Sequence, residues 1–237
     1  MSCKFVQHID KNLIQTLPLT SFEGEVIIVD TPDKVQEAVA YLKDFSVLGV
    51  DTEARPSFKR GVHYPTALVQ VATMERCYLF RLTHVGMPHE LAEIFANPNI
   101  CKVGLAFKDD LNGLRRRRDF KPANCIDLQT IVCKYGIMDL GLQKIFAILF
   151  GKKISKSQQL TNWENSHLTP DQAKYASTDA WATLSIYLEL QKHKPLSKKE
   201  VEALKQAERE AQILRQQEAL ARRQMAEATA QDKNESL

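Results

Sequence analysis

Short apolar segments alternate with segments of helical periodicity along most of the chain. Apolar residues that run continuously, or alternate with polar ones, over about four to eight positions predict strands. Such segments are 24–30, the stretch from 46 to the acids at 51 and 53, 67–73, 77–82, 101–107 and 124–132. Apolar residues spaced by about three or four positions predict helices. These segments are 32–42, 89–96, 108–119, 140–151 and 170–193.

Two of the predicted helices carry clear start signals. Thr31-Pro32 and Thr169-Pro170 each combine an N-cap residue with a proline in the first turn. The first of these helices should bury one face, formed by Val35, Ala38, Val39 and Leu42. Because the strands come first as a meander and then alternate with helices, the sequence predicts an α/β fold, with a mixed sheet of about five or six strands flanked by helices.

The character of the sequence changes after Pro195. Ser197 and Glu200 form a capping-box pattern, and the residues beyond them are rich in Ala, Gln, Glu and Arg. Acidic and basic residues are equally frequent there, so this segment is neutral. A thin apolar stripe favours a solvated helix over a partner-binding or dimer helix. The stripe consists of Val201, Leu204, Ala211 and Leu214.

The composition is that of a soluble globular protein: 237 residues, 44% hydrophobic and 26% charged. A formal net charge of +3 does not by itself indicate a nucleic-acid partner. The five cysteines are widely spaced, which argues against a zinc cluster and a secreted disulfide framework. With no signal-peptide core and no apolar run that could span a bilayer, we expect a cytoplasmic protein without a membrane partner. We expect an N-terminal extension at 1–22, a folded domain at 23–195 and a charged, helical or partly disordered tail at 196–237.

Two acids close the strand that starts near Ser46. Because side chains alternate along a strand, Asp51 and Glu53 should project from one face, with Thr52 on the other. Such a pair often marks only a strand end that meets solvent. However, two carboxylates one strand repeat apart can hold a hard divalent ion, whose charge cancels their repulsion.

Further acids follow a predicted strand and lie within a predicted helix. Asp109 and Asp110 come directly after the strand at 101–107. Helix capping explains Asp109, whereas Asp110 is the better candidate for a site, because ligand crevices form at the carboxyl ends of strands. In the helix that starts at Thr169-Pro170, Tyr175 and Asp179 are four residues apart and therefore lie one turn from each other.

Together, these segments resemble the tyrosine-bearing branch of the DEDD superfamily of 3′–5′ exonucleases, which includes RNase D and the Werner-syndrome-type exonuclease domain. The family's D-x-E motif matches Asp51 and Glu53, and its motif V-G-x-x-x-x-x-D-x-x-x-L matches 103–114, with Asp110 as the acid. Its motif Y-A-x-x-D-A matches 175–180. The resemblance covers residues 23–193 and extends to the connecting segments ALVQVAT and KSQQLTNWE. The short tail is too small for the helicase or RNA-binding domain that such proteins usually carry.

The resemblance implies an RNase H-like fold in which the D-x-E strand is central. It also implies hydrolysis with two Mg²⁺ or Mn²⁺ ions about 4 Å apart, and no nucleotide cofactor. Oxygen ligands suit these hard ions and would not select zinc. The implied catalytic residues are Asp51, Glu53, Asp110, Tyr175 and Asp179. The four acids would be the metal ligands, with Asp110 acting mainly through water. Tyr175, whose reference pKa is about 10, would orient the attacking water.

The implied partner is the 3′ end of a nucleic acid. The likeness to the Werner-type domain favours DNA, and an RNase D-like exoribonuclease that trims RNA is the alternative. A non-catalytic nucleic-acid-binding module is less favoured, because no acid of the family pattern is missing. Arg55, Lys59 and Arg60 directly follow the D-x-E strand, so we expect them to contact the substrate.

Other basic and aromatic residues leave alternatives open. The four arginines at 115–118 point around their helix and cannot form one patch. The lysines at 152, 153 and 156 form another candidate strip for phosphate binding. Trp163 is either a base-stacking platform or a buried core residue, and His63 is a further candidate substrate contact.

Overall fold

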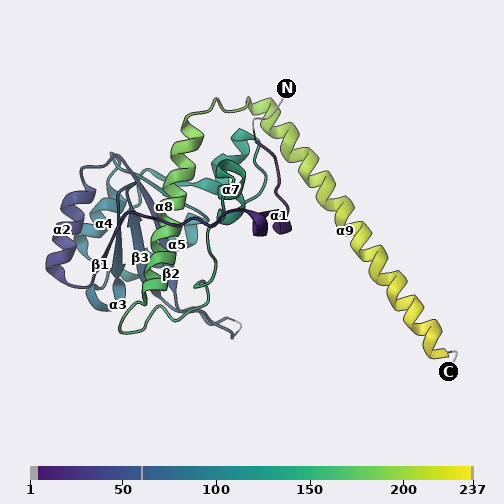
Figure 1. Ribbon diagram of the computed structural model, residues 1–237, viewed down its shortest axis with the longest axis horizontal. Helices are drawn as coiled ribbons and strands as arrows, with labels where there is room; N and C mark the ends of the chain where they lie inside the picture. The colour runs from purple at the N-terminus through teal and green to yellow at the C-terminus, as the bar shows by residue number, and fades with distance from the viewer. Residues whose placement is uncertain (1–4, 60, 236–237) are drawn as a thin grey trace. The chain divides into compact units, whose positions relative to one another are not determined.

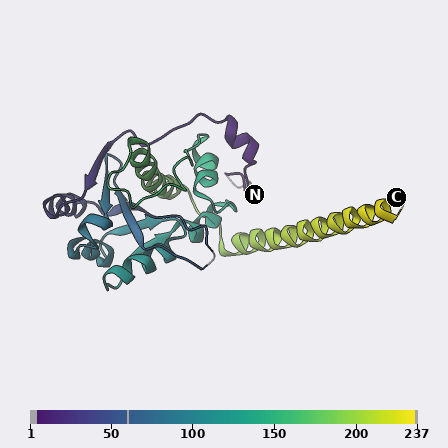
Figure 2. The same cartoon turned by 90° about the horizontal axis from the view of Figure 1, so that it is seen from below.

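The computed structural model of the chain describes residues 5–59 and 61–235. Its backbone contacts divide the chain into two units, one up to Lys194 and the other from Pro195 onwards. The first unit contains a β-sheet with helices on both faces, which confirms the predicted α/β class (Figures 1 and 2). None of the described helices is both long enough and apolar enough to cross a membrane.

Six strands form a mixed sheet in the order β1-β4-β3-β2-β5-β6. Strands β2, β3 and β4 pair antiparallel, as the predicted meander, whereas the pairs β1–β4, β2–β5 and β5–β6 are parallel. The strand that carries the D-x-E acids is β2, and it lies inside the sheet. The strands are β1 (Glu25–Val29), β2 (Val47–Ala54), β3 (Thr66–Ala72), β4 (Arg76–Arg81), β5 (Cys101–Gly104) and β6 (Cys125–Asp127).

One layer of helices covers one face of the sheet (Figure 2). The helices of this layer are α2 (Pro32–Leu42), α3 (Leu82–Val85), α4 (His89–Ala96) and α5 (Phe107–Arg117). Thr31 caps α2 as predicted, because its hydroxyl accepts a hydrogen bond from the Lys34 N–H. The predicted face of α2 is buried in the core, which confirms the periodicity argument for Val35, Ala38, Val39 and Leu42.

Helix α8 (Pro170–Gln191) lies across the opposite face of the sheet, with α7 (Leu142–Phe150) packed beside it (Figure 1). Strand and helix come very close at Gly49 in β2, where an added Cβ would lie 2.1 Å from the carbonyl oxygen of Ala180. A side chain at Gly49 would therefore push α8 away from the sheet. Because side chains alternate along β2, the D-x-E acids face the same side as Gly49 and point toward α8.

The strand predicted at 101–107 is wrong beyond Gly104. The backbone turns at Ala106, whose φ of 53° is left-handed. The carboxylate of Asp127, which ends the neighbouring strand, accepts hydrogen bonds from the N–H groups of Ala106 and Phe107 at 3.0 and 3.1 Å. These bonds satisfy the first free donors of α5, so the helix begins at Phe107, earlier than predicted.

The strand predicted at 124–132 is also wrong beyond Asp127. The chain continues as α6 (Leu128–Ile131) and the 3₁₀ helix η1 (Val132–Tyr135). The Asp127 side chain accepts a further hydrogen bond from the Gln129 N–H at 2.9 Å and so caps α6. The apolar residues of these turns pack in a core with α7 and α8. A short apolar run does not distinguish a buried strand from a buried helical turn.

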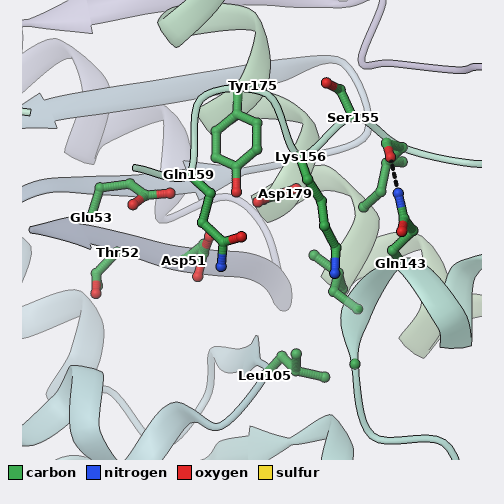
Figure 3. A pocket seen from close by; sticks show the side chains of 13 residues that line it. Asp51, Thr52, Glu53, Leu105, Gln143, Ser155, Lys156, Gln159, Tyr175 and Asp179 are labelled. Atoms are coloured by element: carbon green, nitrogen blue, oxygen red, sulfur yellow. Dashed lines mark hydrogen bonds between the residues drawn. The ribbon is translucent and has the colours of Figure 1, made fainter. Parts of the chain in front are cut away.

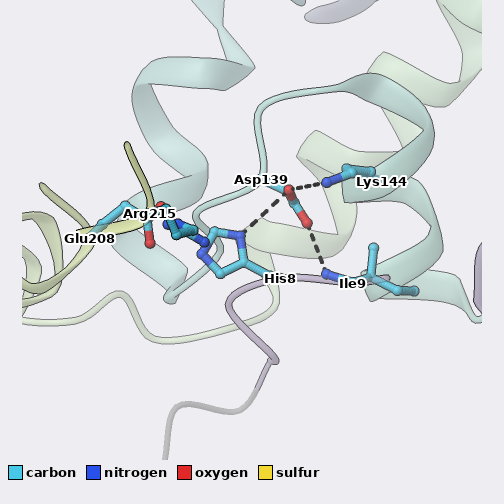
Figure 4. A network of polar contacts seen from close by, with 6 residues as sticks. All are labelled: His8, Ile9, Asp139, Lys144, Glu208 and Arg215. Atoms are coloured by element: carbon cyan, nitrogen blue, oxygen red, sulfur yellow. Dashed lines mark hydrogen bonds and ion pairs between the residues drawn. The ribbon is translucent and has the colours of Figure 1, made fainter. Parts of the chain in front are cut away.

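The N-terminal segment is attached to the rest of the first unit through the buried carboxylate of Asp139 (Figure 4). Asp139 accepts a hydrogen bond from the Ile9 N–H at 2.9 Å and pairs with Lys144 Nζ at 2.7 Å and with His8 Nδ1 at 3.5 Å. The short helix α1 (Lys11–Thr16) follows. These contacts connect the beginning of the described chain to the start of α7.

The second unit consists of one long helix, α9 (Lys198–Glu235). Its predicted capping box is present, because the Glu200 N–H donates to the Ser197 hydroxyl and the Ser197 N–H donates to the Glu200 carboxylate. An ion pair of 2.8 Å joins Arg215 to Glu208 along the helix (Figure 4). The domain boundaries proposed from the sequence, near residues 22 and 195, remain a prediction.

Candidate active site

Three carboxylates meet between the sheet and α8. Strand β2 supplies Asp51 and Glu53, and helix α8 supplies Asp179 (Figure 3). One ligand oxygen from each lies within 4.8 Å of the others. They line a cavity of about 330 Å³. Strand alternation and the close approach at Gly49 together explain how residues more than a hundred positions apart converge here.

The shared site holds the pKa of each carboxyl above its ordinary value. Burial, followed by the charges of Asp179 and Asp110, raises the pKa of Asp51. Burial and the neighbouring acids raise the pKa of Glu53 to about 10. Burial raises the pKa of Asp179 to about 7, although a hydrogen bond from Tyr175 and the charge of Lys156 act to lower it. The site therefore resists holding three negative charges unless a cation is present.

The donor set fits a hard divalent cation. The three residues in ligand distance offer only carboxylate oxygens, which suit Mg²⁺ and Mn²⁺. The four described cysteines are free thiols, and none is in this group. A divalent ion would offset the repulsion that raises the three pKa values. Asp51, Glu53 and Asp179 are therefore the residues that can hold such an ion directly.

Tyr175 lies one turn before Asp179 on α8, and its hydroxyl points toward the carboxylates (Figure 3). Burial, followed by the charges of Asp179 and Glu53, raises the pKa of Tyr175 above its ordinary value. The hydroxyl is therefore protonated at neutral pH and acts as a hydrogen-bond donor. Trp163 packs against the Tyr175 ring, with centroids 6.0 Å apart, and is fully buried. The structure therefore supports the interpretation of Trp163 as a buried core residue, and not as a base-stacking platform.

Asp110 lies in α5, outside the group of three. The hydroxyl of Thr52 donates a hydrogen bond to it at 2.5 Å. Burial raises the pKa of Asp110, while this hydrogen bond lowers it. Thr52, which also lines the carboxylate cavity, thus holds Asp110 beside β2 and outside the group of three. Asp110 is still close enough for its charge to raise the pKa of Asp51 and of Glu53.

The segment before α8 contributes residues to the site, among them Lys156, which the sequence placed in a candidate phosphate-binding strip, and Gln159, which it did not single out. Gln159 lines the cavity with Lys156, and both are labelled in Figure 3. Gln172 holds this segment, because its amide donates to the Thr161 hydroxyl and the Asn162 carbonyl. Arg81 fixes the later part of the same segment, because its guanidinium donates hydrogen bonds to the carbonyls of Asn165 and Ser166. The family-like stretch KSQQLTNWE was the available signal for Gln159.

The structure brings two of the three basic residues proposed as substrate contacts to one exposed cavity. Arg55 stacks over the Tyr64 ring at 4.9 Å and pairs with Glu164 at 3.7 Å. Lys59 lines the same exposed cavity as Arg55, whereas Arg60 lies outside the described residues. His63 lines a different cavity, next to Asp110.

The other two basic groups do not form continuous patches. Within the run at 115–118, Arg117 and Arg118 donate to the backbone carbonyls of Leu82 and Met87, while the first two arginines are exposed. Of the lysine strip, Lys156 alone lines the carboxylate cavity. Lys153 instead donates to the carbonyl of Gln15. The strip is therefore divided between the site and the N-terminal segment.

Comparisons with known proteins bear on the family and the fold. A model of the 3′–5′ exonuclease family matches residues 26–194. The mouse bifunctional 3′-5′ exonuclease/ATP-dependent helicase WRN is 30% identical over 196 residues, which cover 77% of this chain and 14% of the mouse protein. The chain thus spans a small part of that relative.

Two solved structures show the same fold. The EXO domain of Aedes aegypti Nibbler superimposes with a TM-score of 0.66 at 21% identity, over 78% of this chain and 99% of that one. Escherichia coli RNase D, an exoribonuclease involved in structured RNA processing, gives a TM-score of 0.63 at 25% identity, over 76% of this chain and 46% of that one. These likenesses confirm the RNase H-like fold. Since the family model spans nearly all of the sheet and its helices, the chain belongs to the 3′–5′ exonuclease family of the DEDD superfamily.

Proposed function

We propose that this chain is a metal-dependent 3′–5′ exonuclease that removes nucleotides from the 3′ end of DNA. The convergence of Asp51, Glu53 and Asp179 within 4.8 Å, beside Tyr175, carries the proposal. Asp51, Glu53 and Asp179 would hold Mg²⁺ or Mn²⁺ directly, and Asp110 would act through water. Two bound ions would neutralise the phosphate oxygens, stabilise the leaving 3′ oxygen and lower the pKa of the attacking water.

The chain's own residues then orient the reactants. Tyr175 keeps its proton and donates hydrogen bonds, so it would hold the attacking water in line with the phosphorus. It is not a base, because burial and the neighbouring acids raise its pKa further from neutrality. Lys156 extends into the same cavity and would offset the charge of the scissile phosphate.

RNA is the second candidate substrate. RNase D, a structural relative, is described as an exoribonuclease, whereas the name of WRN does not specify a sugar. A protein distinguishes RNA from DNA through contacts with the 2′-hydroxyl. The hydroxyl and amide groups of Ser155, Gln143 and Gln159 line the cavity and could serve as such contacts in an exoribonuclease.

A matched set of labelled oligonucleotides tests the proposed function. We expect 5′-labelled DNA to give a ladder of products shortened from the 3′ end, with Mg²⁺ or Mn²⁺ but not with chelator. The same sequence as RNA should be degraded more slowly. Faster degradation of RNA would favour the second candidate, and release from the 5′ end would contradict the proposal. An inactive Asp51→Asn preparation controls for contaminating nucleases.

An exposed loop next to the site carries the kinds of residues that bind single-stranded nucleic acids. It follows the end of β2 and contains Phe58, whose side chain is 85% exposed. Arg55, Lys59 and Tyr64 line a cavity of about 340 Å³ together with Phe58. Aromatic faces flanked by cations bind single-stranded nucleic acids by stacking on bases and attracting phosphates. We expect this loop to hold the substrate strand near its 3′ end.

Replacement of Phe58 by alanine should weaken substrate binding without changing the chemistry. We expect KM for a long single-stranded oligonucleotide to rise about tenfold, because stacking contributes about 1–3 kcal/mol per base. The turnover number should remain unchanged. Leu13→Ala removes another exposed apolar side chain, in α1, and is the matched control. Equal KM values for Phe58→Ala and Leu13→Ala would show that Phe58 does not contact the substrate.

A further inference from the structure

Gln70 is a polar residue in the centre of the sheet without a hydrogen-bond partner. It lies in β3, within the family-like segment ALVQVAT, and its side chain is completely buried. Both amide atoms, Nε2 and Oε1, lack a hydrogen-bond partner among the described residues. A buried amide usually pairs both groups, because each unpaired group costs free energy relative to water. The unpaired amide therefore needs an explanation.

The strand register places Gln70 directly beside the carboxylate site. Its partner across the antiparallel pair is Asp51 in β2, and its partner in β4 is Leu79. Directly opposite residues project from the same face, with Cβ atoms about 4.5–5.5 Å apart. Along β3, the neighbours on this face are Leu68 and Ala72. Of these four immediate neighbours, Asp51 alone offers a polar side chain.

Charged residues also occupy diagonal positions, but they are farther from Gln70. These are Glu53 on the Asp51 side and Arg81 on the Leu79 side. Two nitrogens of the Arg81 guanidinium donate to backbone carbonyls of the segment before α8, and the third, Nε, is buried without a partner. A guanidinium only donates hydrogen bonds, so it can pair with Oε1 of Gln70 but not with its N–H. Among the neighbours in the sheet, the Asp51 side is therefore the side on which the Nε2 donor can find an acceptor.

Asp51 has acceptor capacity to spare. A carboxylate has two oxygens and about four acceptor positions. Thr52 contributes a backbone hydrogen bond to Asp51. Carboxylates that bind metals are usually held by hydrogen bonds from neighbouring groups, and loss of such a group weakens metal affinity. Gln70 is placed to be that group.

We propose that Gln70 is a positioning residue, whose amide N–H donates to Asp51 and fixes this carboxylate in the orientation that holds the divalent ion. The inference rests on the proposed function, since it assumes that the three carboxylates bind such an ion. Gln70 contributes no charge and touches no substrate. The structure leaves this amide unpaired, and in the proposal it gains a partner when Asp51 turns to hold the ion. Gln70 would then lower stability in chelator and favour metal binding.

Replacement of Gln70 by methionine tests this inference, because methionine has a similar length and no polar hydrogen-bonding group. In chelator, the variant should melt about 3–6 °C above wild type, because an unpaired buried amide is removed. Its affinity for Mn²⁺, measured by calorimetric titration without substrate, should fall about 10- to 100-fold. At saturating Mn²⁺, turnover should recover to within about threefold of wild type, as expected for a residue that acts through Asp51.

Leu68→Met is the matched control, since it changes a buried side chain on the same strand and face. It should keep wild-type Mn²⁺ affinity. Gln70→Leu is a second apolar variant, for use if the methionine does not pack. Wild-type affinity in either folded Gln70 variant would overturn the inference, as would a lower melting temperature in chelator for both. If wild type itself neither binds Mn²⁺ nor releases nucleotides, the proposed function fails instead.

Discussion

Replacement of Asp51 by asparagine should remove nucleotide release almost completely while the protein stays folded. Asp51 shares the site with Glu53 and Asp179, and its loss removes two of the three carboxylate pairs in the group. Metal ions contribute several kcal/mol to stabilising charge in the transition state, so turnover with Mg²⁺ should fall at least about 10³-fold. The measurement is the initial rate on the preferred oligonucleotide. Asp179→Asn should have a comparable effect.

Two variants separate this effect from general damage to the site. Asp109→Asn neutralises an exposed acid in the same helix as Asp110 and should keep wild-type turnover. Tyr175→Phe keeps all the carboxylates and removes only the hydroxyl, so its turnover should fall by about 10²-fold, less than that of Asp51→Asn. Wild-type turnover for Asp51→Asn would contradict the metal mechanism. Wild-type turnover for Tyr175→Phe would contradict its orienting role.

The metal-free protein should lose stability through this site as the pH rises from about 4 to about 8. Burial and the neighbouring acids raise the pKa of Glu53 to about 10, and burial raises that of Asp179 to about 7. The same carboxyls titrate near about 4 in the unfolded chain. Between these values the folded state binds more protons than the unfolded state, so the free energy of unfolding falls as the pH rises. The loss disappears below the unfolded pKa, where both states are protonated.

Thermal melting in chelator measures this effect against a variant that lacks one of the charges. At about pH 8, Asp51→Asn should melt at least about 5 °C above wild type, and the difference should shrink by about pH 5. Mn²⁺ should raise the melting temperature of wild type more than that of the variant, because bound ligand stabilises the folded state. Parallel melting curves at both pH values would show that the carboxyls do not repel each other in the fold.

The faces on which the main residues of the candidate site lie could be predicted, because those faces follow from local periodicity. Alternation along a strand puts Asp51 and Glu53 on one face, and helical spacing puts Tyr175 one turn from Asp179. Neither pattern depends on the rest of the fold. The burial of one face of α2 could be predicted for the same reason.

The ends of β5 and β6 could not be predicted, because they depend on a contact between separate segments. Asp127, the last residue of β6, accepts hydrogen bonds from the N–H groups at the start of α5, which follows β5. Both strands therefore end earlier than predicted. The position of Lys156 and Gln159 in the cavity depends in turn on the hydrogen bonds of Gln172. No local spacing encodes these contacts.

By itself, the sequence determined the fold class, the family and the acids that characterise it, because hydrophobic periodicity and short motifs are properties of neighbouring residues. The tertiary structure alone decided which side chains share one environment. The close approach of α8 at Gly49 brings Asp179 to Asp51, while a hydrogen bond from Thr52 holds Asp110 beside the group of three. The packing of the sheet also buries Gln70 beside Asp51, with no hydrogen-bond partner for its amide. Burial, pairing and pKa depend on distances between residues far apart in the chain, and packing sets those distances.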